Sequence, residues 1–345
     1  MGGVSIKRLL LALLGVCVLA IVVLNWTYGR LPVTPRPTGS LVQLAGGLHV
    51  RYLERPGAEP AVLLIHGLPG TAEDWNEVSA ALAGRRTVAI DRLGYGFSTG
   101  GYFPLDRQLQ AIGELIGELH LRRPVLVGHS YGGTISLAFA ERHPSEVRGL
   151  VLVDAAATCT HNSAFKRTLA RLVKAMELPV LSQIADVTFS QLVRKTSAEQ
   201  VDEEAFSPAP GNPAELHRVL AINMKRGNLE AWAGETLALN AVIEGVNHGL
   251  HGIVAPTIVV QGERDKLVSP QCGGRQLAEA LPHARLEMVS GGHMAPYTHP
   301  ATIAAAVQAV SRQASSGRAG GRVGERRQQG QQSIQRTSNM QGRRQ

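Results

Sequence analysis

The sequence predicts an α/β fold: a mostly parallel central sheet flanked by helices, with an inserted all-helical cap. Short runs of Val, Ile and Leu with little polar alternation are typical of strands buried on both faces. Amphipathic stretches, such as residues 105–121, lie between many of these runs and predict covering helices. The chain has 345 residues and is 44% hydrophobic, which is enough to bury one large core.

The N-terminus carries a long uncharged stretch. Lys7 and Arg8 precede residues 9–29, which as a helix would extend about 30 Å, the thickness of a bilayer core. We interpret residues 1–28 as a transmembrane anchor rather than a cleaved signal peptide, because apolar residues continue past a weak cleavage site. The two basic residues favour a cytoplasmic N-terminus and a folded body outside the cytoplasm. The Pro-rich residues 29–40 are predicted to form an extended linker.

The core of the fold is expected in residues 41–154 and 251–311. Apolar, β-branched segments bounded by turn residues predict its strands. These candidate strands are residues 48–54, 61–67, 86–91, 124–130, 147–154, 256–262 and 284–290.

Residues 155–250 interrupt the alternation, because their apolar residues recur at helical spacing. We interpret this interval as a helical cap over the carboxyl edge of the sheet. Its expected helices are residues 164–178, 197–206, 213–226 and 228–243.

The net charge of +8 is concentrated in the last residues of the chain. Residues 312–345 hold eight arginines and one acid, Glu325, among many Gly, Ser and Gln residues. Such a composition cannot repay the entropy of ordering, so we predict a disordered basic tail. A specific nucleic-acid partner is not expected.

Cysteine and histidine spacing gives little indication of a metal centre. Cys17, Cys159 and Cys272 are odd in number and widely separated, which favours neither a disulfide framework nor a zinc site. His248 and His251 lack a third ligand at a useful spacing. We therefore predict no metal and no organic cofactor.

The most informative motif is Gly128-His129-Ser130-Tyr131-Gly132, a G-x-S-x-G sequence between a predicted strand and a predicted helix. A turn this tight strains the serine backbone, and side chains at Gly128 and Gly132 would collide with it. The serine hydroxyl then projects above the sheet. The N-terminus of the following helix favours negative charge there.

Together with three further motifs, this segment resembles the α/β-hydrolase family over about residues 45–310. The resemblance implies the α/β-hydrolase fold and a serine hydrolase of the esterase and lipase type. The matching segments, in chain order, are HGLPGTAEDW at 66–75, DRLGYGFS at 91–98, GHSYG at 128–132, and the pair GERDKLV at 262–268 and GGHM at 291–294.

The resemblance also implies a catalytic triad. Ser130 would be the nucleophile, and His293, after the last strand and a Gly-Gly turn, would be its base. Asp265 is the preferred acid that orients the imidazole. Asp154, at the end of strand 147–154, is the rival candidate for this role.

Backbone donors are expected to stabilise the oxyanion that develops during acyl transfer. The N–H groups of Tyr131 and Leu68 are the candidates for this oxyanion hole. His66 and Gly67 are interpreted as supports of the loop that carries Leu68.

The sequence thus predicts a membrane-anchored serine hydrolase that cleaves a carboxylic ester with a small to medium hydrophobic acyl group. A small-molecule ester and the membrane are its expected partners. An amide or peptide hydrolase and a carbon–carbon bond hydrolase with the same triad stay open, as does a non-catalytic ligand-binding protein. A serine at position 130 argues against the alkyl-enzyme chemistry of dehalogenases and epoxide hydrolases, whose nucleophile is an aspartate.

Overall fold

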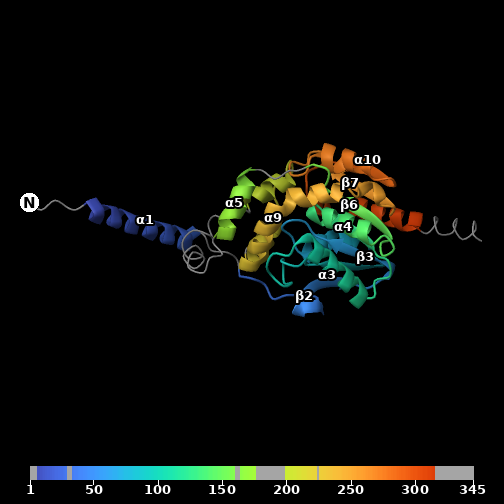
Figure 1. The fold of residues 1–345 in the computed structure, drawn as a ribbon, viewed down its shortest axis with the longest axis horizontal. Helices are drawn as coiled ribbons and strands as arrows, with labels where there is room; N and C mark the ends of the chain where they lie inside the picture. Colours follow the sequence, from blue (N-terminus) through green and yellow to red (C-terminus); the bar gives the residue numbers. More distant parts are fainter. Residues whose placement is uncertain (1–5, 29–32, 160–163, 176–198, 224, 315–345) are drawn as a thin grey trace, which may run out of the picture.

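A computed structural model describes residues 6–28, 33–159, 164–175, 199–223 and 225–314 of the chain. Its body is an eight-stranded sheet with helices on both faces (Figure 1). The α/β class predicted from the sequence is therefore confirmed.

The sheet has the strand order β1-β2-β4-β3-β5-β6-β7-β8. The pairs β1–β2 and β2–β4 at one side of the sheet are antiparallel, and the pairs from β4 to β8 are parallel. All seven predicted strands are present, while the short edge strand β1 was not expected. The bounds are β1 Ser40–Gln43, β2 His49–Arg55, β3 Ala58–Ile65, β4 Arg85–Ile90, β5 Val125–His129, β6 Gly149–Val153, β7 Thr257–Gly262 and β8 Ala284–Val289.

Helices cover both faces of the sheet. α3 (Leu105–Glu118), α4 (Tyr131–Arg142) and α10 (Leu277–Ala280) pack on one face, and α2 (Asn76–Ala81) and the helix at 300–314 on the other. Leu63 of β3 belongs to the first apolar cluster, and Leu64 to the second. The inner strands β5, β6 and β7 are buried along their whole length because successive side chains enter different cores.

The described residues between β6 and β7 form helices and contain no strand. α5 (Ala164–Ala175) packs against α9 (Arg226–Asn247), and both lie toward the α1 side of the body in Figure 1. Residues 199–206 are helical, and α8 (Pro213–Arg218) continues into a π-helical turn. Part of the predicted helices, residues 176–178, 197–198 and 224, lies outside the described residues.

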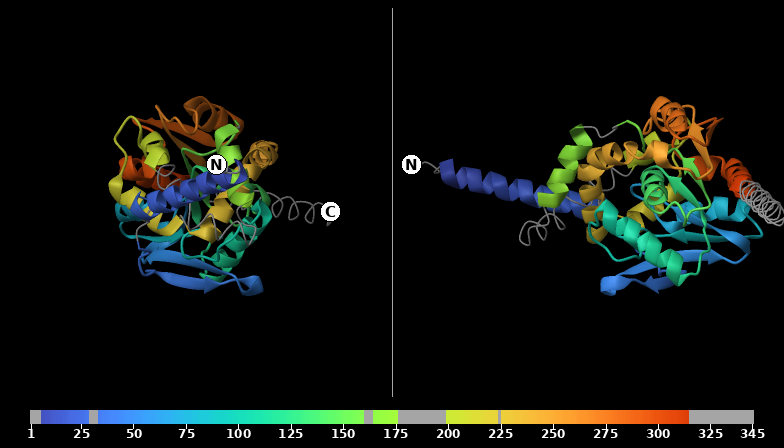
Figure 2. Two further views of the ribbon diagram at one scale, coloured as in Figure 1. Left: turned by 90° about the vertical axis from the view of Figure 1, so that its left-hand side faces the viewer. Right: turned by 45° about the vertical axis from the view of Figure 1, so that its right-hand side comes forward.

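The N-terminal apolar stretch forms helix α1, Ile6–Tyr28, which extends away from the sheet and its covering helices in Figures 1 and 2. Among the described residues, however, no helix combines the length and apolar character needed to cross a membrane. The predicted transmembrane anchor at 1–28 is therefore wrong. The extracytoplasmic location that was inferred from this anchor is wrong for the same reason.

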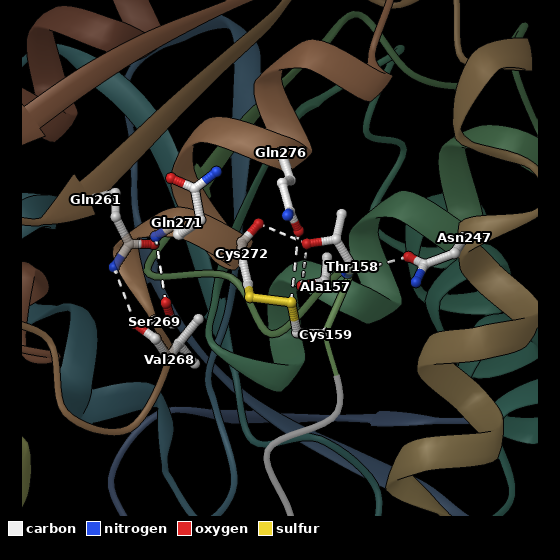
Figure 3. Close-up of a disulfide and its surroundings, with 10 residues drawn as sticks. All are labelled: Ala157, Thr158, Cys159, Asn247, Gln261, Val268, Ser269, Gln271, Cys272 and Gln276. Carbon is white, nitrogen blue, oxygen red and sulfur yellow. Dashed lines mark hydrogen bonds between the residues drawn. A yellow bond between two sulfur atoms is a disulfide. The ribbon is translucent and has the colours of Figure 1, made fainter.

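Two of the three cysteines form a disulfide, which the spacing argument did not predict. Cys159 follows β6 and Cys272 follows β7, and their Cα atoms lie 5.5 Å apart although 113 positions separate them in sequence. Figure 3 shows the bond between these two loops. Thr158 reinforces the junction by donating from Oγ1 to the Cys272 carbonyl at 2.6 Å. Because β6 and β7 are parallel neighbours, the loops that follow them lie at the same end of the sheet. The spacing of the cysteines in the sequence cannot reveal that proximity.

Candidate active site

Ser130 occupies the sharp turn between β5 and α4. Its backbone has φ 51° and ψ −120°, a conformation that residues other than glycine rarely adopt. The strain is held in place by hydrogen bonds, because the Ser130 N–H donates to the Val153 carbonyl at 2.9 Å and the Ala156 N–H donates to the Ser130 carbonyl at 3.0 Å. The turn thus projects from the centre of the sheet at the carboxyl end of its strands.

The glycines beside this serine leave no room for side chains. A Cβ on Gly128 would lie 2.4 Å from the Gly132 carbonyl oxygen, and a Cβ on Gly132 would lie 2.2 Å from the Ile65 carbonyl oxygen. Both distances are far below van der Waals contact. The steric reason inferred for the G-x-S-x-G pattern is therefore correct for these two positions.

A carboxylate and an imidazole from two separate loops meet beside this turn. His293 Nδ1 lies 2.7 Å from Oδ2 of Asp265, and both side chains are buried. The second Asp265 oxygen accepts hydrogen bonds from the N–H groups of Leu267 and Val268 at 2.8 and 2.9 Å. Gln261 donates to Oδ2 at 3.1 Å, so the carboxylate is fixed in this orientation.

Asp265 and His293 shift each other's pKa values in opposite directions. Burial by itself lowers the pKa of His293, but the charge and hydrogen bond of Asp265 outweigh burial and raise the pKa above its ordinary value. Burial likewise opposes ionisation of Asp265, yet His293 and the two backbone N–H groups bring the pKa of this carboxyl below its ordinary value. Asp265 is therefore ionised, and its imidazole partner is a stronger base than a free histidine.

Asp154, the rival acid, lies nearby but is bound differently. Its Oδ1 accepts a hydrogen bond from the Gly262 N–H at 2.8 Å, and its Oδ2 accepts one from the Ala295 N–H at 3.2 Å. Burial, with the negative charge of Asp265, raises the pKa of Asp154 to about 8. No hydrogen bond joins Asp154 to the His293 ring among the residues that the structure describes. The geometry thus pairs the histidine with Asp265.

The histidine loop is also held through its backbone. His129 donates from Nε2 to the His293 carbonyl at 2.8 Å, and the two rings lie 4.8 Å apart. The His293 N–H donates to the Ala205 carbonyl at 2.9 Å. Within the described part of the chain, the Ser130 hydroxyl makes no hydrogen bond to His293. Such bonds are often long without substrate and tighten in the complex.

The loop after β3 lies directly against the serine. A Cβ on Gly67 would be 3.0 Å from the Ser130 Cβ, so the backbone at Gly67 and Leu68 borders the hydroxyl. In the described structure the Leu68 N–H has no hydrogen-bond partner. Tyr131 is the first residue of α4, where helix N–H groups lack intrahelical partners. Both predicted oxyanion donors therefore lie beside Ser130.

His66 braces this loop. Its Nδ1 donates to the Gly67 carbonyl at 2.9 Å, and its Nε2 accepts from the Arg92 N–H at 3.0 Å. Burial, and then the charge of Arg92, lower the pKa of His66 well below its ordinary value, so the ring is neutral. With both nitrogens occupied, His66 supports the loop and has no free atom for proton transfer.

Sequence reasoning missed a buried ion pair behind the same loop. Arg92 lies within the DRLGYGFS motif, and Glu235 belongs to α9, more than a hundred residues later. Their side chains form two hydrogen bonds of 2.6 and 3.0 Å, and both residues are 1% exposed. The motif pointed to Arg92, but no local pattern marks Glu235.

His129, Asp154 and His293 form a group whose ligand atoms all lie within 4.8 Å of one another. His129 Nε2 carries a proton toward the His293 carbonyl, and His293 Nδ1 faces Asp265. Both Asp154 oxygens accept backbone hydrogen bonds. One nitrogen of each imidazole and both Asp154 oxygens are thus engaged in holding the loops of the site together.

The chain is similar in sequence to several known proteins. The chain is 39% identical over 119 residues to a 2-hydroxy-6-oxo-2,4-heptadienoate hydrolase of Pseudomonas putida, a match covering 32% of this chain and 43% of that protein. This chain therefore spans less than half of the length of that relative. It is 27% identical over 267 residues to haloalkane dehalogenase 2 of Mycobacterium bovis, covering 74% of this chain and 89% of the relative.

Solved structures show the same architecture. A thermophilic esterase from Thermogutta terrifontis superposes with a TM-score of 0.65 at 19% identity, covering 81% of this chain and 99% of that chain. At this identity the likeness concerns the fold. A family model described as alpha/beta hydrolase fold matches residues 60–300, which include every candidate site residue from His66 to His293. The chain therefore belongs to the alpha/beta hydrolase fold family.

Proposed function

We propose that this protein is a serine hydrolase that cleaves carboxylic esters of small to medium hydrophobic acids. The 2.7 Å contact between His293 and Asp265, beside a serine at a strained turn, carries this proposal. Asp265 fixes the imidazole with a proton on Nδ1, which leaves Nε2 unprotonated as a base. A serine hydroxyl becomes an effective nucleophile when such a base can take its proton.

The reaction proceeds through an acyl-enzyme. The Ser130 oxygen attacks the ester carbonyl carbon while His293 takes the hydroxyl proton, and the protonated imidazole then gives that proton to the departing alcohol. Water, deprotonated by the same imidazole, attacks the acyl-enzyme and releases the carboxylic acid. The Leu68 and Tyr131 N–H groups, which lie beside Ser130, bind the oxyanion in both halves of the reaction.

We further infer that residues 155–250 form a cap that shapes the acyl pocket. Two contacts of this segment support the inference, because the Ala205 carbonyl accepts from the His293 N–H and Glu235 pairs with Arg92. The segment thus contacts the histidine loop directly, and it contacts the loop that carries Leu68 through Arg92. A small-molecule ester is the partner that such a site would take.

Replacement of the nucleophile tests the proposal. Ser130→Ala should abolish hydrolysis of 4-nitrophenyl butyrate and labelling by a fluorophosphonate, while the circular dichroism spectrum stays that of the parent protein. Ser290→Ala, at an exposed serine outside the site, is the control and should retain both reactions. Labelling that survives in Ser130→Ala would refute the assignment. A panel of nitrophenyl esters from acetate to laurate then measures the acyl preference.

A second candidate is hydrolysis of a carbon–carbon bond in a diketone-like substrate. The Pseudomonas putida relative favours it, because the name of that protein specifies an oxo-dienoate. The same serine and histidine would serve, with a carbanion in place of the alkoxide as leaving group. Turnover of an oxo-dienoate with a kcat/KM above that of every nitrophenyl ester would favour this candidate over the ester hydrolase.

A further inference from the structure

The peptide unit between Gly67 and Leu68 is fixed by hydrogen bonds to its carbonyl oxygen. Its carbonyl oxygen accepts hydrogen bonds from His66 Nδ1 at 2.9 Å and from Arg92 Nη2 at 2.8 Å. In a planar trans peptide the carbonyl and the following N–H point in opposite directions. Any group that fixes the Gly67 carbonyl therefore also sets the direction of the Leu68 N–H.

Arg92 holds two consecutive peptides of this loop. Besides the Gly67 carbonyl, its Nε donates to the His66 carbonyl at 3.1 Å. The guanidinium also lies over the Tyr131 ring, with its central carbon 5.2 Å from the ring centroid. One buried arginine thus contacts the residues on both sides of the proposed oxyanion hole.

Glu235 of α9 sets the position of this guanidinium. Its carboxylate forms a two-point contact with Arg92 at 2.6 and 3.0 Å. Tyr95 donates to the same carboxylate at 2.7 Å and Gln108 at 3.3 Å, so its oxygens are fully occupied. The planar fork of an arginine held at two points has little freedom left to rotate.

A contribution to folding stability does not explain why the Arg92–Glu235 ion pair is buried. Removing two charges from water costs several kcal/mol per ion, and apolar residues of similar volume often stabilise a protein as well or better. The donors of Arg92 instead satisfy specific carbonyls of one loop, the loop that borders Ser130. The arrangement is therefore suited to positioning.

We propose that Arg92 and Glu235 are positioning residues that aim the Leu68 N–H at the oxyanion, so that helix α9 completes the oxyanion hole. This inference rests on the proposed ester hydrolysis. It assigns to the segment between β6 and β7 a part in transition-state stabilisation in addition to its part in the acyl pocket.

The test separates transition-state effects from substrate binding. Glu235→Gln removes the charge that holds the guanidinium, and hydrolysis of 4-nitrophenyl butyrate is measured under steady-state conditions. We expect kcat to fall about 10- to 100-fold, somewhat less than for outright loss of an oxyanion donor, with KM changed by less than about twofold. A lost transition-state contact lowers kcat, whereas a disturbed pocket raises KM.

Two further variants test whether any disturbed arginine–carboxylate ion pair in the core would lower kcat. Arg51→Lys is the matched control, because Arg51 pairs with Glu73 and Asp91 and donates to no carbonyl of the Leu68 loop. Its kcat should stay within about twofold of the parent value. The double variant Arg92→Met/Glu235→Leu replaces the ion pair by apolar packing. Its melting temperature should lie closer to the parent value than that of Glu235→Gln, while its kcat stays low.

The outcomes are distinguishable. Equal kcat values in Glu235→Gln and Arg51→Lys, or recovery of kcat together with stability in the double variant, would overturn the positioning role while leaving the ester hydrolase intact. Absence of Ser130-dependent ester hydrolysis in the parent protein would overturn the proposed function and this inference together.

Discussion

His293 and Asp265 meet through a 2.7 Å contact between Nδ1 and Oδ2, at the ends of two parallel strands that are neighbours in the sheet. The Asp265 carboxylate is also bound by the N–H groups of its own loop, which prevents it from turning away. The imidazole is therefore oriented by a rigid acceptor. The proposed chemistry depends on this one relationship.

Loss of that acceptor should affect the rate far more than binding. In Asp265→Asn the amide nitrogen can face Nδ1 and favour the wrong tautomer of His293. We expect kcat for 4-nitrophenyl butyrate to fall about 10³- to 10⁴-fold with little change in KM. Steady-state kinetics on folded protein, checked by circular dichroism, measures both parameters.

Asp154→Asn is the matched control for this substitution. Because the pKa of Asp154 is raised to about 8, its side chain is already uncharged at neutral pH, and an amide changes the local charge little. We expect a loss of stability of about 1–3 kcal/mol from its backbone contacts but a fall in kcat of less than about tenfold. A larger loss of kcat in Asp154→Asn than in Asp265→Asn would exchange the roles of the two acids.

The pH dependence of the reaction should follow the raised pKa of His293. The imidazole must be neutral to act as a base, and Asp265 stabilises its charged form. The value of kcat/KM should therefore rise with pH through a midpoint above about 6.5, the ordinary histidine value. Asp265→Asn removes the stabilising charge, so the midpoint of its residual activity should move to lower pH. A midpoint that stays in place or rises would contradict the assignment of this carboxylate.

Much of the fold follows from local pattern. Near-continuous apolar runs such as the one in β3 predicted strands buried on both faces, because Leu63 and Leu64 enter different cores. The turn at Ser130 was also readable, since carbonyl oxygens of Gly132 and Ile65 leave no space for side chains at Gly128 and Gly132. These features depend on neighbours a few positions apart, and a sequence displays such neighbours directly.

Contacts between distant segments could not be read in this way. Glu235 is one acid among many on a helix, and only the packed structure places it against Arg92. Cys159 and Cys272 become neighbours because β6 and β7 are adjacent, which their spacing does not reveal. The apolar stretch of α1 shows the opposite error, because a helix was expected and found, but a membrane span was inferred from it as well.

The disulfide should contribute measurably to stability. It closes a loop of 113 positions, and constraint of the unfolded chain by such a loop is worth roughly 2–4 kcal/mol. Cys272→Ser should therefore lower the free energy of unfolding in urea by about that amount. Cys17→Ser, which removes the exposed free thiol of α1, should leave it unchanged. An unfolding midpoint of the parent protein that is insensitive to a reducing agent would contradict this expectation.

Two glycine substitutions should have opposite effects on stability. In Gly132→Ala the new Cβ would lie 2.2 Å from the Ile65 carbonyl oxygen, and backbone there cannot give way without moving β3. We expect a loss of about 3 kcal/mol or more. In Gly113→Ala, within α3, the nearest atom lies 3.8 Å away, so alanine should stabilise the helix by about 0.5–1 kcal/mol. Urea unfolding of both variants measures the difference, and a Gly132→Ala protein as stable as Gly113→Ala would contradict the close packing described for the turn at Ser130.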